Sequence, residues 1–106
     1  MKRDYSRPRG SSLNMRRIIT RSKKTLQADF PEVKVVFDLE TYTPYTLNQT
    51  AALLWDFLKR PRESNKIIDF LQNRYKISLD RATQDAGKFI LALKKKGLVQ
   101  IRVIPD

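Results

Sequence analysis

Residues 42–55 read Tyr-Thr-Pro-Tyr-Thr-Leu-Asn-Gln-Thr-Ala-Ala-Leu-Leu-Trp, and this stretch changes from a strand pattern to a helix pattern. Tyr and Thr favour a strand in its first half. Pro44 confines that strand to a sheet edge, because proline has no backbone donor for a ladder on both sides. Asn48 is a good helix N-cap before a run that is apolar on most sides. The stretch therefore predicts an edge strand followed directly by a buried helix.

The region before this stretch is predicted to form two more strands. An uneven first strand is expected to start near Ile18 and to run toward Leu26. The clearest strand is residues 33–39, and residues 40–41 then turn the chain into the edge strand. The residues that share one face of the clearest strand at period two are Val33, Val35, Phe37 and Leu39.

Two more helices are predicted after the quoted stretch. Ser64 is expected to cap the first of them, and Ser78 or Asp80 the second. Gly97 is placed to end the last helix as its C′ residue, and residues 98–104 can add a short strand. The order of about three strands followed by three helices predicts an α+β domain. The core-facing stripe of the last helix is predicted to be Ala82, Ala86, Phe89, Ile90 and Leu93.

The composition excludes most enzyme chemistry. The 106 residues suit one domain and include neither Cys nor His, so thiol catalysis, imidazole catalysis and the metal sites built on these side chains are excluded. The three Gly residues lie far apart and form no phosphate-binding loop. No two acidic residues have a spacing that indicates shared acid–base work. A binding protein is therefore expected rather than an enzyme, with no cofactor and no metal.

Charge divides the chain into an arm and a body. Of the net charge of +11, residues 1–24 carry +8, from nine basic residues and one acidic residue. Residues 1–14 combine Arg, Ser, Pro and Gly with few apolar residues, which predicts a disordered basic arm before a folded domain at residues 15–104. Such an arm can bind nucleic acid or an acidic partner. No apolar run approaches the ~20 residues of a membrane span, and no signal peptide is apparent, so a cytoplasmic protein without membrane attachment is expected.

Residues 39–99 resemble the precursor-recognition domain of the pyrroloquinoline quinone biosynthesis protein D family. The resemblance rests first on residues 42–55, with an aromatic strand, a Leu-Asn step and Trp55 in the following helix. It rests also on residues 91–99, Leu-Ala-Leu-Lys-Lys-Lys-Gly-Leu-Val, which look like the family's closing helix and its Gly-Leu end. This resemblance to a PqqD-like protein implies a winged-helix-like fold, with a three-stranded antiparallel sheet followed by three helices. It also implies that the protein has no catalytic activity.

The resemblance also implies a function. It is that of a peptide chaperone, which binds the leader segment of a ribosomally made precursor peptide and presents it to a modifying enzyme. That enzyme is often a radical S-adenosylmethionine protein or a leader peptidase. In the family the leader lies as an added strand between the third strand and the third helix. The pathway stays open between a quinone cofactor, a lasso-type peptide and another modified peptide.

Two other functions fit parts of the sequence. A nucleic-acid-binding winged-helix protein is the alternative, because the net charge is high and Lys88 and residues 94–96 place four lysines on the last helix. The acidic Asp80 and Asp85 on the same helix weaken that interpretation. The chain also suits a structural subunit of a larger complex. Phosphate binding should fall steeply with salt, and strand addition should fall less.

The expected peptide site has a strand wall and a helix wall. In the strand, Tyr42, Pro44 and Thr46 should direct their backbone groups outward, because Pro44 cannot donate into the ladder. On the helix, Leu91 is an apolar residue among polar neighbours on the side away from the core. No catalytic or metal-binding residue is expected. The predicted peptide-binding residues are Tyr42, Thr43, Pro44, Tyr45, Thr46, Gln84, Lys88, Leu91 and Lys95.

Overall fold

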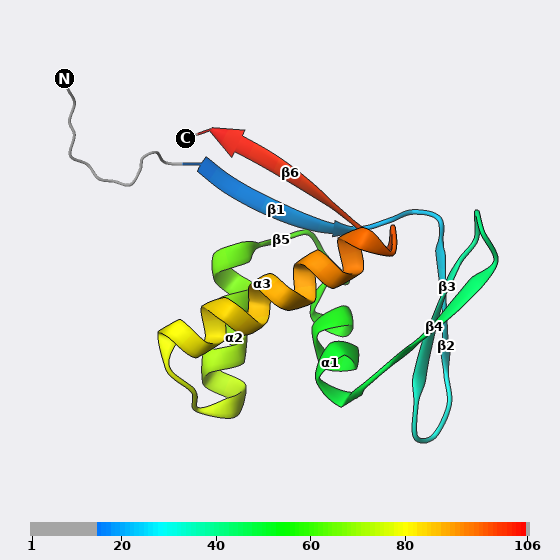
Figure 1. Ribbon diagram of the computed structural model, residues 1–106, viewed down its shortest axis with the longest axis horizontal. Helices are drawn as coiled ribbons and strands as arrows, with labels where there is room; N and C mark the ends of the chain where they lie inside the picture. The colour runs from blue at the N-terminus through cyan, green and yellow to red at the C-terminus, as the bar shows by residue number, and fades with distance from the viewer. Residues whose placement is uncertain (1–14, 106) are drawn as a thin grey trace.

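The computed structural model describes residues 15–105 and contains two antiparallel three-stranded sheets and three helices (Figure 1). This confirms the predicted α+β class. The predicted disordered arm, residues 1–14, lies outside the described residues. The strands are β1 (Met15–Arg21), β2 (Thr25–Asp29), β3 (Lys34–Asp38), β4 (Thr43–Leu47), β5 (Arg62–Glu63) and β6 (Val99–Pro105). The helices are α1 (Gln49–Phe57), α2 (Ser64–Tyr75) and α3 (Leu79–Lys95).

The two sheets divide the expected first strand between them. The chain forms β1, turns at residues 22–24, and then forms β2 in the other sheet. One sheet has the order β2-β3-β4, which is the predicted three-stranded antiparallel sheet. The other has the order β5-β1-β6 and was not predicted as a sheet, although β6 confirms the expected strand after Gly97. Figure 1 shows β1 and β6 side by side along one edge of the molecule, with β2, β3 and β4 at its far end. The winged-helix-like arrangement stays a prediction.

Capping explains where the helices begin and end. Asn48 and Ser78 cap α1 and α3, each accepting a hydrogen bond from the backbone N–H three residues on, at 2.8 and 3.1 Å. Gly97 follows α3 with φ 74°, a left-handed conformation that glycine adopts without a Cβ penalty. The predicted cap at Ser64 is wrong. Ser64 is the first residue of α2, and Glu63 precedes it without a side-chain capping bond.

Trp55 joins α1 to both sheets. Its side chain is only 1% exposed, and its indole Nε1 donates to Gln27 Oε1 of β2 at 3.0 Å. The Arg21 guanidinium of β1 lies 4.4 Å from the Trp55 ring centroid and donates to the Trp55 carbonyl. Partial burial lowers the pKa of Arg21 below its ordinary value. Trp55 belongs to the buried core, which also includes Ile19, Val36, Leu47, Leu54, Leu58, Ile67, Leu71, Leu93 and Leu98.

Lys34 forms a second link between the β2-β3-β4 sheet and α1. Its Nζ lies 2.5 Å from Asp29 Oδ1 and 3.2 Å from Asp56 Oδ1, and its side chain is 12% exposed. The hydrogen bond with Asp29 raises the pKa of Lys34 and lowers the pKa of Asp29. Both groups are therefore held in their charged forms. Among residues 15–105, no helix is long and apolar enough to cross a membrane.

This link predicts how stability depends on pH. The lowered pKa of Asp29 stabilises the fold above the ordinary value of 3.8, and that stability is lost as pH falls through the folded-state pKa. The raised pKa of Lys34 stabilises the fold below 10.5, and that stability is lost as pH rises through the folded-state pKa. Lys34→Met removes the charge and keeps most of the apolar stem. On acidification from neutral pH to a pH below 3.8, the unfolding free energy of the variant should fall by less than that of the wild type. The reason is that Asp29 no longer has Lys34 to lower its pKa.

Urea unfolding at the two pH values measures this difference. Lys66→Met removes an exposed lysine of α2 and serves as the matched control, which should follow the wild type. An acid-induced loss of equal size in Lys34→Met and the wild type would contradict the role given to the Lys34–Asp29 pair.

Candidate functional site

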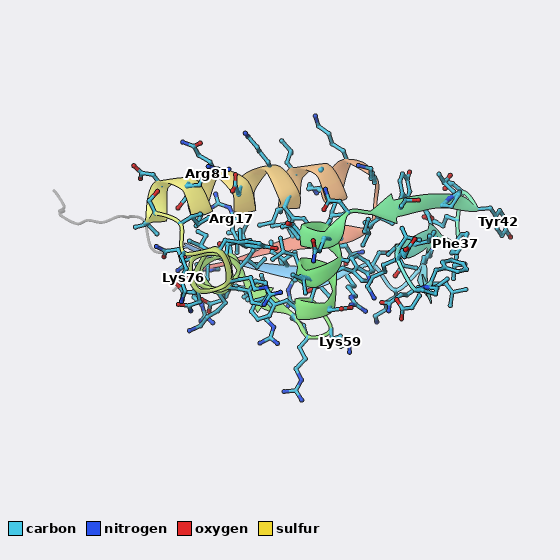
Figure 2. The ribbon with its side chains drawn as sticks, turned by 90° about the horizontal axis from the view of Figure 1, so that it is seen from below. Arg17, Phe37, Tyr42, Lys59, Lys76 and Arg81 are labelled. Atoms are coloured by element: carbon cyan, nitrogen blue, oxygen red, sulfur yellow. The ribbon has the colours of Figure 1, made fainter. Side chains whose placement is uncertain are left out.

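A groove of about 730 Å³ lies between β4 and α3. Tyr45, Thr46 and Leu47 of β4 form one of its walls. The apolar floor includes Leu54 of α1 and Leu71 of α2, which are both fully buried. Figure 2 shows α3 and β4 on the same side of α1. The opposite wall is formed by residues of α3 and its C-cap: Arg81, Asp85, Lys88, Phe89, Ala92, Leu93 and Lys96.

The β4 wall carries unpaired backbone groups. β4 pairs with β3 on one side, and no strand within residues 15–105 pairs with its other edge. The register places Pro44 opposite Phe37. Because proline has no N–H, this pair is of the type that exchanges no hydrogen bonds. The carbonyl of Pro44 and both backbone groups of Thr46 therefore point away from β3, toward the free edge.

Tyr42 does not belong to this edge, contrary to the prediction. The strand begins at Thr43, and Tyr42 lies in the preceding turn with φ 57° and an 81% exposed side chain. Asp38 closes the turn, because its Oδ1 accepts from the backbone N–H groups of Glu40 and Thr41 at 2.8 and 3.4 Å. Outward backbone donors were predicted at Tyr42 and Thr46. Of these two residues only Thr46 lies in β4, so its N–H is the one that the strand edge offers.

The rim of the groove is positively charged. Arg81 pairs with Asp85 along α3 at 3.2 Å, so the excess charge of the lining comes from Lys88 and Lys96. Lys96 Nζ lies 5.8 Å from the ring centroid of Tyr45, a cation–π contact between the two walls. An acidic or neutral segment suits this rim better than a basic one.

Residues of α1 and α2 also line the groove, among them Thr50 and Tyr75. The hydroxyl groups of Tyr75 and Thr50 lie 3.1 Å apart and connect these helices. The groove therefore offers an extended segment three features: a strand edge, an apolar floor and a basic rim. No group of three potential metal ligands occurs within residues 15–105.

The structure brings together part of the predicted site. Tyr45, Thr46 and Lys88 line the groove. Leu91 and Lys95 lie beside it, in an adjoining hollow of about 390 Å³ that shares Tyr45 and Lys88 with the groove. Leu91 is 53% exposed, as the helical wheel predicts for a residue off the core-facing stripe.

Other predicted residues lie outside both hollows. Thr43 and Pro44 belong to β4 without lining either hollow, and Gln84 is exposed on α3. The side of α3 that lines the groove is rotated about the helix axis relative to the side predicted to bind the peptide. The reason is that the position of β4 decides which residues of α3 face the groove. Spacing by three or four residues from Lys88 would have found the missed helix residues. These are Arg81, Asp85, Ala92 and Lys96. Thr50, Tyr75 and Ile77 come from other segments, and no local pattern marks them.

The α+β fold, with a groove between an edge strand and the last helix, is that of a small binding domain. The family model of coenzyme PQQ synthesis protein D (PqqD) matches residues 34–99, and the chain belongs to this family. The match covers β3 through the start of β6 and includes both walls of the groove. No curated protein matches the sequence.

Two solved structures share the fold. One is TbiB1 in complex with the TbiA(beta) leader peptide, at 24% identity and a TM-score of 0.67, covering 76% of this chain and 94% of that one. The other is lasso peptide synthetase B1 complexed with the leader peptide, at 22% identity and a TM-score of 0.69, covering 77% and 96%. Both agree with the resemblance noted in the sequence.

The direction of the β4 backbone groups predicts the effect of two substitutions. Pro44→Ala adds an N–H that meets water at the free edge, so the unfolding free energy should change little. Thr43→Pro removes an N–H directed at β3 and should cost about 1 kcal/mol or more. Urea unfolding of the two variants measures this contrast. If Pro44→Ala instead gained about 1 kcal/mol, as a new ladder bond would provide, the assigned edge would be wrong.

Proposed function

We propose that this protein binds the leader segment of a ribosomally made precursor peptide and presents it to a modifying enzyme. The leader adds as a fourth strand to β4, between β4 and α3. The observation that carries this proposal is the free edge of β4, because it forms one wall of the groove. The partners are then the precursor peptide and an enzyme such as a radical S-adenosylmethionine protein or a leader peptidase.

The groove supports each component of strand addition. The backbone of an added strand pairs with the carbonyl of Pro44 and with both backbone groups of Thr46. Alternate side chains of that strand reach the apolar floor near Leu54 and Leu71. Ala92 is small and exposed on the facing side of α3, so it leaves room for the strand. Acidic leader residues pair with Lys88 and Lys96 at the rim.

Family membership and fold support the same role. The two similar solved structures described above were each determined with a leader peptide. The absence of Cys and His from the sequence agrees with a recognition protein rather than a catalyst. The pathway, the cytoplasmic location and the absence of catalytic activity remain proposals.

The topology gives no support to the nucleic-acid alternative. A DNA-binding winged helix normally follows its reading helix with a hairpin wing. Here β6 follows α3 and pairs with β1 from the start of the described residues. Of the lysines on α3 and its C-cap, Lys88 and Lys96 line the groove, where Lys96 contacts Tyr45.

Calorimetric titration tests the proposed function directly. The titrant is the leader segment of the cognate precursor peptide. The control titrant is a scrambled leader of the same composition. Saturable one-to-one binding of the leader alone is expected, because strand addition depends on side-chain order. Equal binding of both peptides would indicate attraction by charge only and would reject the proposal.

Two substitutions in α3 locate the leader. Lys88→Glu reverses a charge at the groove rim, and Leu91→Glu places a charge in the adjoining hollow. Each should weaken leader binding by about 1–3 kcal/mol, the range of a good interface contact. Lys94→Glu is the control, because it makes the same charge change on α3 outside both hollows. Lys94→Glu should weaken leader binding less, because it loses only the long-range attraction between its positive charge and an acidic leader.

The comparison is informative only for folded variants, so each is first checked by thermal melting. If Lys88→Glu and Lys94→Glu weakened binding equally, the rim would act only through total charge. If Lys88→Glu and Leu91→Glu both bound the leader like the wild type, the leader would lie elsewhere.

A further inference from the structure

The β2-β3-β4 sheet has a second, outer apolar face. Its inner face is turned toward the core, as shown by the buried Val36 and by the Gln27–Trp55 hydrogen bond. Neighbouring residues of a strand point to opposite faces, so the residues between these form the outer face. The strand register aligns them in two rows: Leu26, Phe37 and Pro44, then Ala28, Val35 and Thr46.

This outer face is partly exposed: Leu26, Pro44 and Thr46 are exposed, whereas Ala28, Val35 and Phe37 are half-buried. Leu26 is 57% exposed, and the ends of the sheet add Phe30 at 56% and Leu39 at 44%. Figure 2 shows Phe37 near Tyr42, at the end of the molecule far from α2. An antiparallel sheet with one solvated face normally directs polar residues outward, but here the six residues include no charge and a single hydroxyl. None of the six belongs to the core of the described residues. The pattern is that of a sheet covered on both faces.

We propose that this outer face docks the modifying enzyme to which the leader-bound precursor peptide is presented. The inference rests on the proposed function. The face includes Pro44 and Thr46 of β4, the strand that takes the leader at its free edge. A leader added there extends the sheet and places alternate side chains on the same outer face. The docking surface is therefore composite, and it is complete only when the leader is bound.

Charge and size favour an enzyme over a second copy of this chain. Each copy has a net charge of +11, so two copies repel each other. A stable interface uses about 20–30 residues on each side. The outer face with its two exposed ends provides far fewer. A partner that also contacts the leader gains the missing area, and an acidic border around its apolar patch complements the basic chain.

The test compares two Leu→Asp substitutions of nearly equal exposure. Leu26→Asp changes the outer face, where the side chain is 57% exposed. Leu79→Asp changes the start of α3, where it is 59% exposed. The probe is the cognate modifying enzyme, immobilised and titrated with the full chain, with and without the leader. Leu39→Asp, at the end of the same face, is the second variant in case Leu26→Asp does not fold.

Wild-type chain should bind the enzyme more tightly with the leader than without it. Leu26→Asp or Leu39→Asp should weaken the leader-loaded complex by about ten-fold or more, as expected at an apolar contact. Leu79→Asp should stay within about two-fold of the wild type. All three variants should retain wild-type affinity for the leader alone, measured by calorimetry.

Four results would overturn the docking surface. Two of them are equal binding of Leu26→Asp and the wild type by the enzyme, and no binding of the leader-loaded wild type. The third is a loss of leader affinity in Leu26→Asp, which would make the face part of the leader site. The fourth is a wild-type dimer in sedimentation that Leu26→Asp dissociates, which would identify the occupant as a second copy. Loss of leader binding by the wild type would instead reject the proposed function, and the docking with it.

Discussion

The position of the groove depends on the buried side chain of Trp55. Its ring packs beneath Arg21 of β1, and its indole nitrogen donates to Gln27 of β2. The contact with Arg21 holds α1 to the β5-β1-β6 sheet, and the hydrogen bond with Gln27 holds it to the β2-β3-β4 sheet. Because β4 leads directly into α1 at Asn48, fixing α1 also fixes the edge strand. The groove exists because this edge is held opposite α3 with a gap between them, and the gap is not filled by side chains.

The two sheets have different roles in this arrangement. The β5-β1-β6 sheet closes the domain by pairing its first described strand with its last. The β2-β3-β4 sheet offers a free edge to the groove and an apolar outer face on its other side. Pro44 lies at the junction of these two surfaces. It has no N–H to donate to a second copy of the strand, which lowers the tendency of an exposed edge to pair with itself.

Local signals predicted much of the fold. The caps at Asn48 and Ser78 and the helix stop at Gly97 depend on neighbouring backbone groups, so the sequence reveals them. The break between β1 and β2 has no comparable signal. β5 has only two residues, and its pairing with β1 joins positions far apart in the chain. The conformation of Tyr42 was missed because a left-handed tyrosine is uncommon.

Side-chain patterns predicted faces but not what covers them. The period-two pattern at Val35 and Phe37 correctly groups residues of one face, yet the residue buried in the core is Val36 of the other face. Similarly, the wheel for α3 identified its core-facing side, but the groove wall includes Ala92 and Lys96 because β4 lies there. Which face of a strand or helix is covered depends on how distant segments pack against it. The periodicity of a short stretch of sequence carries no information about that packing.

Amide hydrogen exchange at Thr46 tests strand addition most directly. The Thr46 N–H points to the free edge, whereas the Tyr45 N–H is directed at Val36 of β3 and serves as an internal control. Thr46 should exchange rapidly in the free protein and about ten-fold or more slowly when the leader is bound, because its N–H then enters a ladder. Tyr45 should change far less. Unchanged exchange at Thr46 in the leader-saturated protein would contradict the addition of a strand to β4.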